Sequence, residues 1–261
     1  MKIIEKFVAG KQSEETCEDG WVATDDFVAV VDGSTSKTPF RLVPEVKNGR
    51  LAMQLIISFI RELPGESSVF DFCKGITDYF AQEYQKRGML SRMAIHPEER
   101  LTASAIVYSR ERREVWMVGD CQALIDGVLH ENSKPYEQEV AQRRVALIRQ
   151  QGLSPAVARK KIEPLLIQSM LDGQNKTYAV IDGFEIYMPG VKVIEAKDSK
   201  EIVLASDGYP FLLPTWQESE QALRRQLQDD PQNVSQFIAT KGLVAGNQSF
   251  DDRTYVRFLV P

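Results

Sequence analysis

The sequence places acids directly after apolar, strand-like segments, at Asp32, Asp120 and Asp207. Two acid pairs, Glu18–Asp19 and Asp251–Asp252, lie beside further strand-like segments. A β-forming run that ends in Asp-Gly delivers a carboxylate and an exposed carbonyl to a sheet edge, although a single Asp-Gly is also a common turn. Carboxylates that gather in one place repel one another unless a cation neutralises them, and all-oxygen ligation selects Mg²⁺, Mn²⁺ or Ca²⁺. The repetition therefore predicts a divalent-metal site.

Two such ions can hold a water between them, lower its pKa and stabilise an in-line displacement at phosphorus. The sequence contains no G-x-S-x-G motif, no glycine-rich nucleotide loop and no thiolate or imidazole set for zinc. His96 and His130 lie in a polar loop and a charged turn, where surface roles are favoured. No side chain is therefore predicted to act as the nucleophile.

Strands joined by tight turns must bring these acids together. Apolar runs at 2–10 and 20–31 predict a strand and then a hairpin, and the two ends of that hairpin place Glu18–Asp19 beside Asp32. Residues 102–125 predict a meander of short antiparallel strands. Further strands are predicted at 178–187, 192–195, 201–206 and 254–260.

Helical periodicity predicts the elements that cover these strands. The predicted helices span 49–60, the segment after Ser67 or Ser68, two pieces within 134–171, and the segments 217–227 and 233–240. Strands and helices that do not alternate regularly predict an α+β fold with antiparallel sheets covered by helices. The two pieces within 134–171 either cap a sheet or form a lid over the site.

Composition limits the classes of function. A chain of 261 residues that is 43% hydrophobic can bury one full core, so residues 1–261 are predicted to form a single domain. The net charge of −5 disfavours nucleic acid as the main partner, and no segment has the apolar length of a membrane span. Three widely spaced cysteines, Cys17, Cys73 and Cys121, favour a reducing cytoplasm and core positions. The sequence predicts no oligomeric state.

Several short motifs occur in the order and approximate spacing that one enzyme family uses. They are Glu18–Gly20, Phe27–Gly33, Trp116–Ala123, Leu204–Gly208 and Phe250–Val256. In addition, His130–Pro135 followed by Glu137–Glu139 looks like the stretch that this family places after its Gly-Asp motif. From Glu18 to its C-terminus, the chain therefore resembles the type 2C, metal-dependent (PPM-type) serine/threonine protein phosphatases.

This resemblance implies a four-layer α-β-β-α sandwich, in which helix pairs flank two antiparallel sheets and 134–171 forms a helical insertion. It also implies two Mn²⁺ or Mg²⁺ ions at one end of the sandwich and a metal-bridging hydroxide that attacks phosphorus. By position, Asp32 would bridge both ions and the Gly33 carbonyl would bind one of them. Asp207 and Asp251 would complete the other, and Glu18 and Asp19 would bind directly or through waters. Asp120 would match the acid that helps to bind a third ion.

The chain departs from the family pattern in three places. Ser34–Lys37 replaces the usual small residue or histidine and Gly-Gly, so the usual histidine acid is missing. Glu14 occupies the position of the expected phosphate-binding cation, which leaves Lys11, Lys37 and Ser34 as candidates to bind the substrate phosphate. Phe211 lies near the expected position of a second acid for the third ion.

The resemblance implies a cytoplasmic Mg²⁺/Mn²⁺-dependent phosphomonoester hydrolase that acts on phosphoserine or phosphothreonine in a phosphoprotein substrate. One alternative is a non-catalytic or weakly active phosphatase-like domain that serves as a binding or regulatory module, which the departures at Glu14 and Ser34 favour. Another is hydrolysis of a small phosphorylated metabolite.

Overall fold

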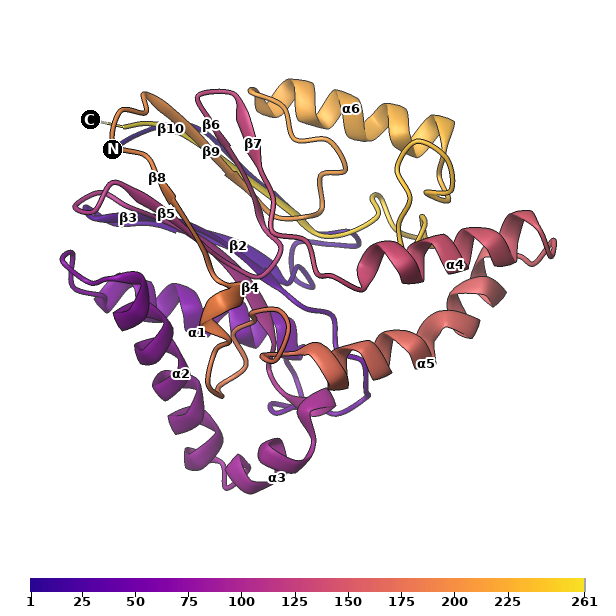
Figure 1. The fold of residues 1–261 in the computed structure, drawn as a ribbon, viewed down its shortest axis with the longest axis horizontal. Helices are drawn as coiled ribbons and strands as arrows, with labels where there is room; N and C mark the ends of the chain where they lie inside the picture. The colour runs from indigo at the N-terminus through magenta and orange to yellow at the C-terminus, as the bar shows by residue number, and fades with distance from the viewer. Residues whose placement is uncertain (261) are drawn as a thin grey trace.

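Two five-stranded antiparallel sheets form the centre of the computed structural model, which describes residues 1–260 (Figure 1). The first sheet has the order β1 (Lys2–Ala9), β10 (Arg253–Leu259), β9 (Glu201–Ala205), β6 (Gln122–Ile125) and β7 (Val128–His130). The second has the order β2 (Asp19–Ala23), β3 (Phe27–Gly33), β4 (Ala103–Ser109), β5 (Glu114–Val118) and β8 (Lys192–Glu195).

Helices cover the outer faces of both sheets. The pair α1 (Asn48–Glu62) and α2 (Val69–Lys86) packs on the second sheet, and α6 (Trp216–Asp229) packs on the first. The remaining elements are α3 (Leu90–Ile95), α4 (Glu137–Arg149), α5 (Pro155–Gly173) and the short 3₁₀ turns η1 (Pro97–Glu99) and η2 (Met188–Gly190). No helix within residues 1–260 combines the length and apolarity needed to cross a membrane.

The central strand β3 is apolar on both faces because both faces are covered. Val28 and Val30 pack between the two sheets, whereas Ala29 and Val31 face the helices α1 and α2. Helix α1 supplies its buried face at helical spacing, with Ile56 and Ile60 fully buried. The four-layer α-β-β-α sandwich expected from the sequence is therefore confirmed, with the second layer of helices reduced to α6 alone.

One predicted connection is wrong. Residues 102–125 do not form a simple meander, because β4 and β5 belong to the second sheet and β6 belongs to the first. The chain crosses between the sheets at Gly119–Asp120, where Gly119 has φ +94°. The sequence does not distinguish this crossing from a turn within one sheet, because both use the same residue types.

The strand predicted at 178–187 does not form. The side chain of Asn175 instead forms hydrogen bonds with the backbone of this segment. Its Oδ1 accepts hydrogen bonds from the backbone N–H of Val180 (3.0 Å) and Tyr187 (3.3 Å). Its Nδ2 donates to the Val180 carbonyl at 3.0 Å. The Asn175 side chain thus satisfies the backbone of Val180 and Tyr187, and only Ile181 pairs with a strand, through an isolated bridge to Ala103 of β4.

The helix predicted at 233–240 is also absent. The Asp230 carboxylate accepts hydrogen bonds from the backbone N–H of Val234 (2.9 Å) and Ser235 (2.8 Å), which fixes a turn after α6. Within this turn Asn233 has φ +50°, in the left-handed region. The segment 231–241 therefore continues as irregular chain and approaches α4 (Figure 1).

The helices within 134–171 project from one end of the sandwich (Figure 1). Helices α4 and α5 pack on each other through a small core of their own, which contains Val140, Ile162 and Leu166. Both also line a cavity that opens on the acid cluster. The pair therefore packs on itself rather than capping a sheet, and a lid over the site stays a prediction.

Candidate functional site

The β2–β3 hairpin brings the first acids together. Asp19 and Asp32 are paired across the two strands, and Asp32 is also opposite Ser104 on β4. Side chains at paired positions on one face of a sheet lie close together. The prediction that the two ends of this hairpin place Asp19 beside Asp32 is therefore confirmed.

The N-terminus of α1 packs tightly against the end of β3. A Cβ on Gly33 would lie 2.1 Å from the Gly49 carbonyl oxygen, and a Cβ on Gly49 would lie 2.6 Å from Oε1 of Glu18. Only glycine allows this approach at either position. The close packing places the positive end of the α1 dipole next to the buried Glu18 carboxylate.

Asp120 is positioned by the crossing between the sheets. Ser104 donates a hydrogen bond to its carboxylate at 2.6 Å, and the Lys134 ammonium forms an ion pair with it. Burial alone would raise the pKa of Asp120, but Lys134 and Ser104 more than offset this and lower the pKa below its usual value. Asp120 therefore stays ionised and has a cation partner of its own.

Asp207 follows β9 and is exposed to a cavity of about 560 Å³. Asp32, Gly33 and Asp120 line the same cavity. The sequence-predicted acids from three separate segments thus meet at one end of the sandwich.

These carboxylates raise one another's proton affinity. Burial, followed by the charges of Asp19, Asp207 and Asp120, raises the pKa of Asp32 well above its usual value. Burial raises the pKa of Asp19 to about 7, with further contributions from Asp252 and Asp207. A cation placed among these groups would remove the repulsion.

Two buried carboxylate oxygens at the site have no hydrogen-bond partner within residues 1–260, namely Oε1 of Glu18 and Oδ2 of Asp19. Both residues are at most 3% exposed. Leaving charged oxygens buried and unpaired is costly. Their chemistry fits a hard divalent cation, since carboxylate and carbonyl oxygens are the ligands that Mg²⁺ and Mn²⁺ prefer.

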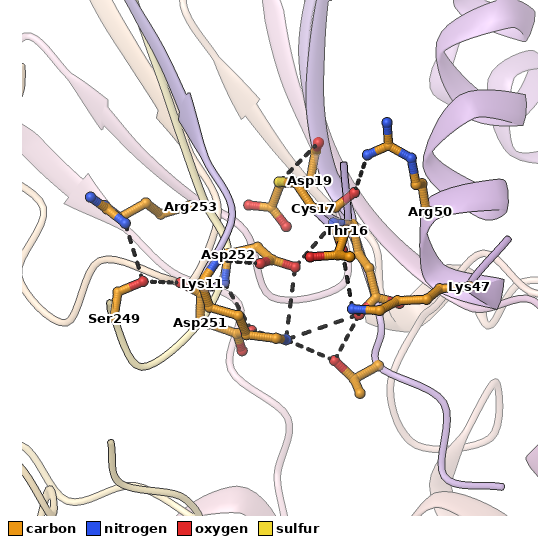
Figure 2. Close-up of polar contacts among 12 residues, drawn as sticks. Lys11, Thr16, Cys17, Asp19, Lys47, Arg50, Ser249, Asp251, Asp252 and Arg253 are labelled. Carbon is orange, nitrogen blue, oxygen red and sulfur yellow. Dashed lines mark hydrogen bonds and ion pairs between the residues drawn. The ribbon is translucent and has the colours of Figure 1, made fainter. Parts of the chain in front are cut away.

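Asp251 lies in a different environment from the other predicted ligands. Its carboxylate accepts a hydrogen bond from the Lys11 ammonium at 2.7 Å (Figure 2). It also forms an ion pair with Lys241. The neighbouring Asp252 accepts from the backbone N–H of Lys11 (2.6 Å) and of Glu18 (3.0 Å). Asp252 thus links the chain at Lys11 to the chain at Glu18, and Asp251 is neutralised by lysines.

The candidate phosphate contacts divide into two groups. Ser34 and Lys37 line the cavity beside Asp32. The Lys11 ammonium instead lies among acids, 3.7 Å from Asp252 and 4.0 Å from Glu18, and donates to Thr35 at 3.0 Å (Figure 2). The structure therefore favours Ser34 and Lys37 over Lys11 for contact with a ligand in the cavity.

Within residues 1–260, no group of three or more His, Cys, Asp or Glu side chains is arranged as a ready metal site. The lysine contacts are consistent with this, because Lys11, Lys134 and Lys241 each occupy part of the carboxylate donor set. The donors that remain for a divalent ion are Asp19, Asp32, Asp207, the Gly33 carbonyl and the unpartnered oxygen of Glu18. The roles of all predicted ligands, including Asp251, stay predictions.

Sequence reasoning missed the cations of this site. Lys134, Arg159 and Lys241 line the cavity together with the acids, yet they come from α5 and from segments far apart in the chain. The one available signal was Lys134, which lies in the segment that looks like the family's stretch after Gly-Asp. Nothing in the sequence distinguishes Arg159 or Lys241 from solvated surface cations.

Comparison with solved structures identifies the architecture. A crystal structure of a bacterial serine phosphatase bearing one arginine substitution matches with a TM-score of 0.50 and 11% identity, over 98% of this chain and 97% of that chain. This chain has the type 2C phosphatase fold. The expected resemblance is therefore confirmed at the level of fold, because an identity this low shows the fold alone.

Two further solved structures give lower TM-scores. The serine/threonine phosphatase Stp1 from Staphylococcus aureus gives a TM-score of 0.49 at 12% identity, over 100% of this chain and 95% of that one. The catalytic domain of the serine/threonine protein phosphatase PstP, in complex with two manganese ions, gives 0.47 at 14% identity, over 100% of both chains. No protein-family model matches the sequence, and no curated protein matches it.

Proposed function

We propose that this protein is a divalent-ion-dependent phosphomonoesterase that removes phosphate from phosphoserine or phosphothreonine in proteins. The observation that carries the proposal is the convergence of Asp19, Asp32, Asp120 and Asp207 at one end of a type 2C fold, where three of them open on a 560 Å³ cavity. Unpartnered buried oxygens of Glu18 and Asp19 supply a reason for these acids to bind a cation. Mn²⁺ and Mg²⁺ are the proposed ions.

Bound divalent ions would lower the pKa of a water and stabilise charge on the phosphoryl oxygens. The chain's own residues position the substrate. Ser34 and Lys37 lie in the loop that follows Asp32, the single acid of β3, and they line the cavity, so they can donate hydrogen bonds to the phosphate. A phosphomonoester dianion could therefore bind between ions held by the acids and the ammonium group of Lys37.

The leaving alkoxide of serine or threonine needs a proton, and the family's usual histidine is missing. Glu137, the first residue of α4, lines the same cavity. Burial raises the pKa of Glu137 to about 7, with Asp120 and Asp207 adding to the rise and Lys134 opposing it. A carboxyl group that is partly protonated near neutral pH is suited to general-acid catalysis. Glu137 is therefore the proposed proton donor.

The test is hydrolysis of p-nitrophenyl phosphate and of a phosphoserine peptide with and without Mn²⁺. We expect Asp32→Ala and Asp207→Ala to lower kcat/KM by at least about 100-fold, because each removes a predicted ion ligand. Asp198→Ala, which removes an exposed acid that does not line the cavity, is the matched control and should behave as wild type. Equal residual rates in wild type and the two site variants would exclude catalysis by this centre.

The binding of Asp251 by two lysines favours a second candidate, a phosphatase-like domain that binds a phosphoprotein without turnover. Isothermal titration calorimetry separates the two. Mn²⁺ binding that depends on Asp32, together with no measurable hydrolysis of any phosphopeptide, would support the binding module. Mn²⁺ binding with turnover supports the enzyme.

A further inference from the structure

Four cationic side chains line the same cavity as the acids: Lys37, Lys134, Arg159 and Lys241. We call these four residues the basic wall. They come from four separate segments, namely the loop after β3, the residues before α4, helix α5 and the chain after α6. The same cavity is also lined by acids, namely Asp32, Asp120, Glu131, Glu137, Asp207 and Asp251, so an anionic ligand depends on those cations that the acids leave without a partner.

Two members of the basic wall already have partners. Lys134 is paired with Asp120, and Lys241 is paired with Asp251. Among residues 1–260, neither Lys37 nor Arg159 has a carboxylate within the 4.0 Å of an ion pair. The site therefore contains two cations that a ligand can still neutralise.

Repulsion among these cations lowers the proton affinity of Lys37. Lys37 is in contact with solvent and also lines the cavity. Burial, followed by repulsion from Lys134, Lys241 and Arg159, lowers the pKa of Lys37 to about 8. Glu137 opposes this change but does not reverse it. An anion that enters the cavity would relieve the repulsion.

Arg159 is fixed in place and still has donors to offer. One of its terminal nitrogens donates a hydrogen bond to the Thr240 carbonyl at 2.9 Å, which ties α5 to the segment 231–241. That segment is held from the other side by the buried Arg144, which donates to the Gln232 carbonyl at 2.8 Å. A guanidinium carries five N–H donors, so an arginine fixed through one of them keeps a planar donor fork for a ligand.

Lys37 and Arg159 belong to different parts of the chain. Lys37 follows four residues after Gly33, beside the acids, and remains the candidate contact to the phosphate. Arg159 comes from the helical insertion and lines the cavity with Phe237–Lys241 rather than from the strand ends. A ligand whose phosphate contacts Lys37 can therefore place a second acceptor group at Arg159.

We propose that Arg159 binds a substrate carboxylate, so that the enzyme prefers phosphoserine or phosphothreonine with an aspartate or glutamate close by in the peptide. The pairing follows from chemistry, because guanidinium and carboxylate form parallel hydrogen bonds of matching geometry. This inference rests on the proposed phosphatase function and names a residue that determines specificity.

The test compares three phosphoserine peptides that differ only in their flanking residues, which are Asp, Ala or Lys. For wild type, we expect kcat/KM for the Asp peptide to exceed that for the Ala peptide by about five- to tenfold, mainly through KM. In Arg159→Met this ratio should fall to about one, and in Arg159→Glu the Lys peptide should become the best substrate. Arg159→Lys should keep a reduced preference for the Asp peptide.

Lys160→Met is the matched control, since Lys160 is the next residue on α5, is exposed and does not line the cavity. It removes the same charge and should leave the wild-type ratio unchanged. An equal loss of the ratio in Lys160→Met would assign the preference to general charge and overturn the role of Arg159. Equal kcat/KM for the three peptides in wild type would overturn it as well.

Equilibrium binding of the same fluorescein-labelled peptides, followed by anisotropy in the presence of Ca²⁺, separates this inference from the proposed function. Absence of turnover for every peptide would reject the phosphatase function. The acidic subsite would still be supported if the Asp peptide bound at least fivefold more tightly than the Lys peptide and Arg159→Met removed the difference. Equal affinities would reject the subsite.

Discussion

At the scale of single residues, this site combines acids with cations from the same chain. Asp120 has Lys134, and Asp251 has Lys11 and Lys241, whereas Asp19 and Asp32 have no comparable cation. The raised pKa of the latter two follows from burial and like charge. Lysines of the chain therefore neutralise Asp120 and Asp251, whereas Asp19 and Asp32 remain available to bind an ion.

The proposed role of Glu137 gives a prediction that separates proton donation from binding. We expect Glu137→Gln to lower kcat for a phosphoserine peptide by about 100-fold, because the serine alkoxide is a poor leaving group that needs a proton. For p-nitrophenyl phosphate, whose leaving group is stable as an anion, the loss should be under about fivefold.

The pH profile checks the same assignment. Because the protonated form of Glu137 is the donor, kcat for the peptide should decline as pH rises through the pKa of this carboxyl group, which burial raises. This decline should be absent in Glu137→Gln. Equal losses for the two substrates would instead indicate that Glu137 only shapes the cavity. Glu139→Gln, an exposed change on the same helix, serves as the control.

At the scale of elements, the cavity depends on contacts between α4, α5 and the segment 231–241. Arg144 on α4 is 1% exposed and donates hydrogen bonds to the carbonyls of Gln232 (2.8 Å) and Ala239 (3.2 Å). We expect Arg144→Met to lower the free energy of unfolding by about 2–3 kcal/mol, because two carbonyls lose a charged donor. Arg143→Met, an exposed change one residue earlier, should cost under about 0.5 kcal/mol.

Urea denaturation measures both variants, and limited proteolysis reports the local effect. Arg144→Met should expose 231–241 to cleavage under conditions in which wild type and Arg143→Met remain intact. Equal stability of the two variants would show that Arg144 does not hold this segment in place.

The same elements show what a sequence can predict. The β2–β3 hairpin and the helices α1, α2 and α6 follow from periodicity, since each buries one face by local spacing. The strand at 178–187 and the helix at 233–240 were wrong because Asn175 and Asp230 satisfy the backbone with side chains. The partners of the acids, Lys134 and Lys241, depend on tertiary contacts between distant segments, which one sequence does not display.

At the scale of the whole molecule, the sandwich brings together carboxylates that oppose folding unless they are neutralised. The pKa of Asp19 is about 7 in the folded protein, against about 3.9 for an unperturbed aspartate. Between these values the folded state binds more protons than the unfolded state, so stability falls as pH rises. Asp32 shifts in the same direction.

Thermal unfolding in EDTA should therefore give a lower Tm at pH 8 than at pH 5, where a change of about 1 kcal/mol corresponds to about 2–4 °C. Asp19→Asn should reduce this difference, because the amide cannot ionise, while Asp198→Asn should preserve it. Mn²⁺ should raise the Tm of wild type more at pH 8 than at pH 5, since a cation binds ionised carboxylates. A Mn²⁺ shift that is independent of pH and of Asp19 would place ion binding outside this cluster.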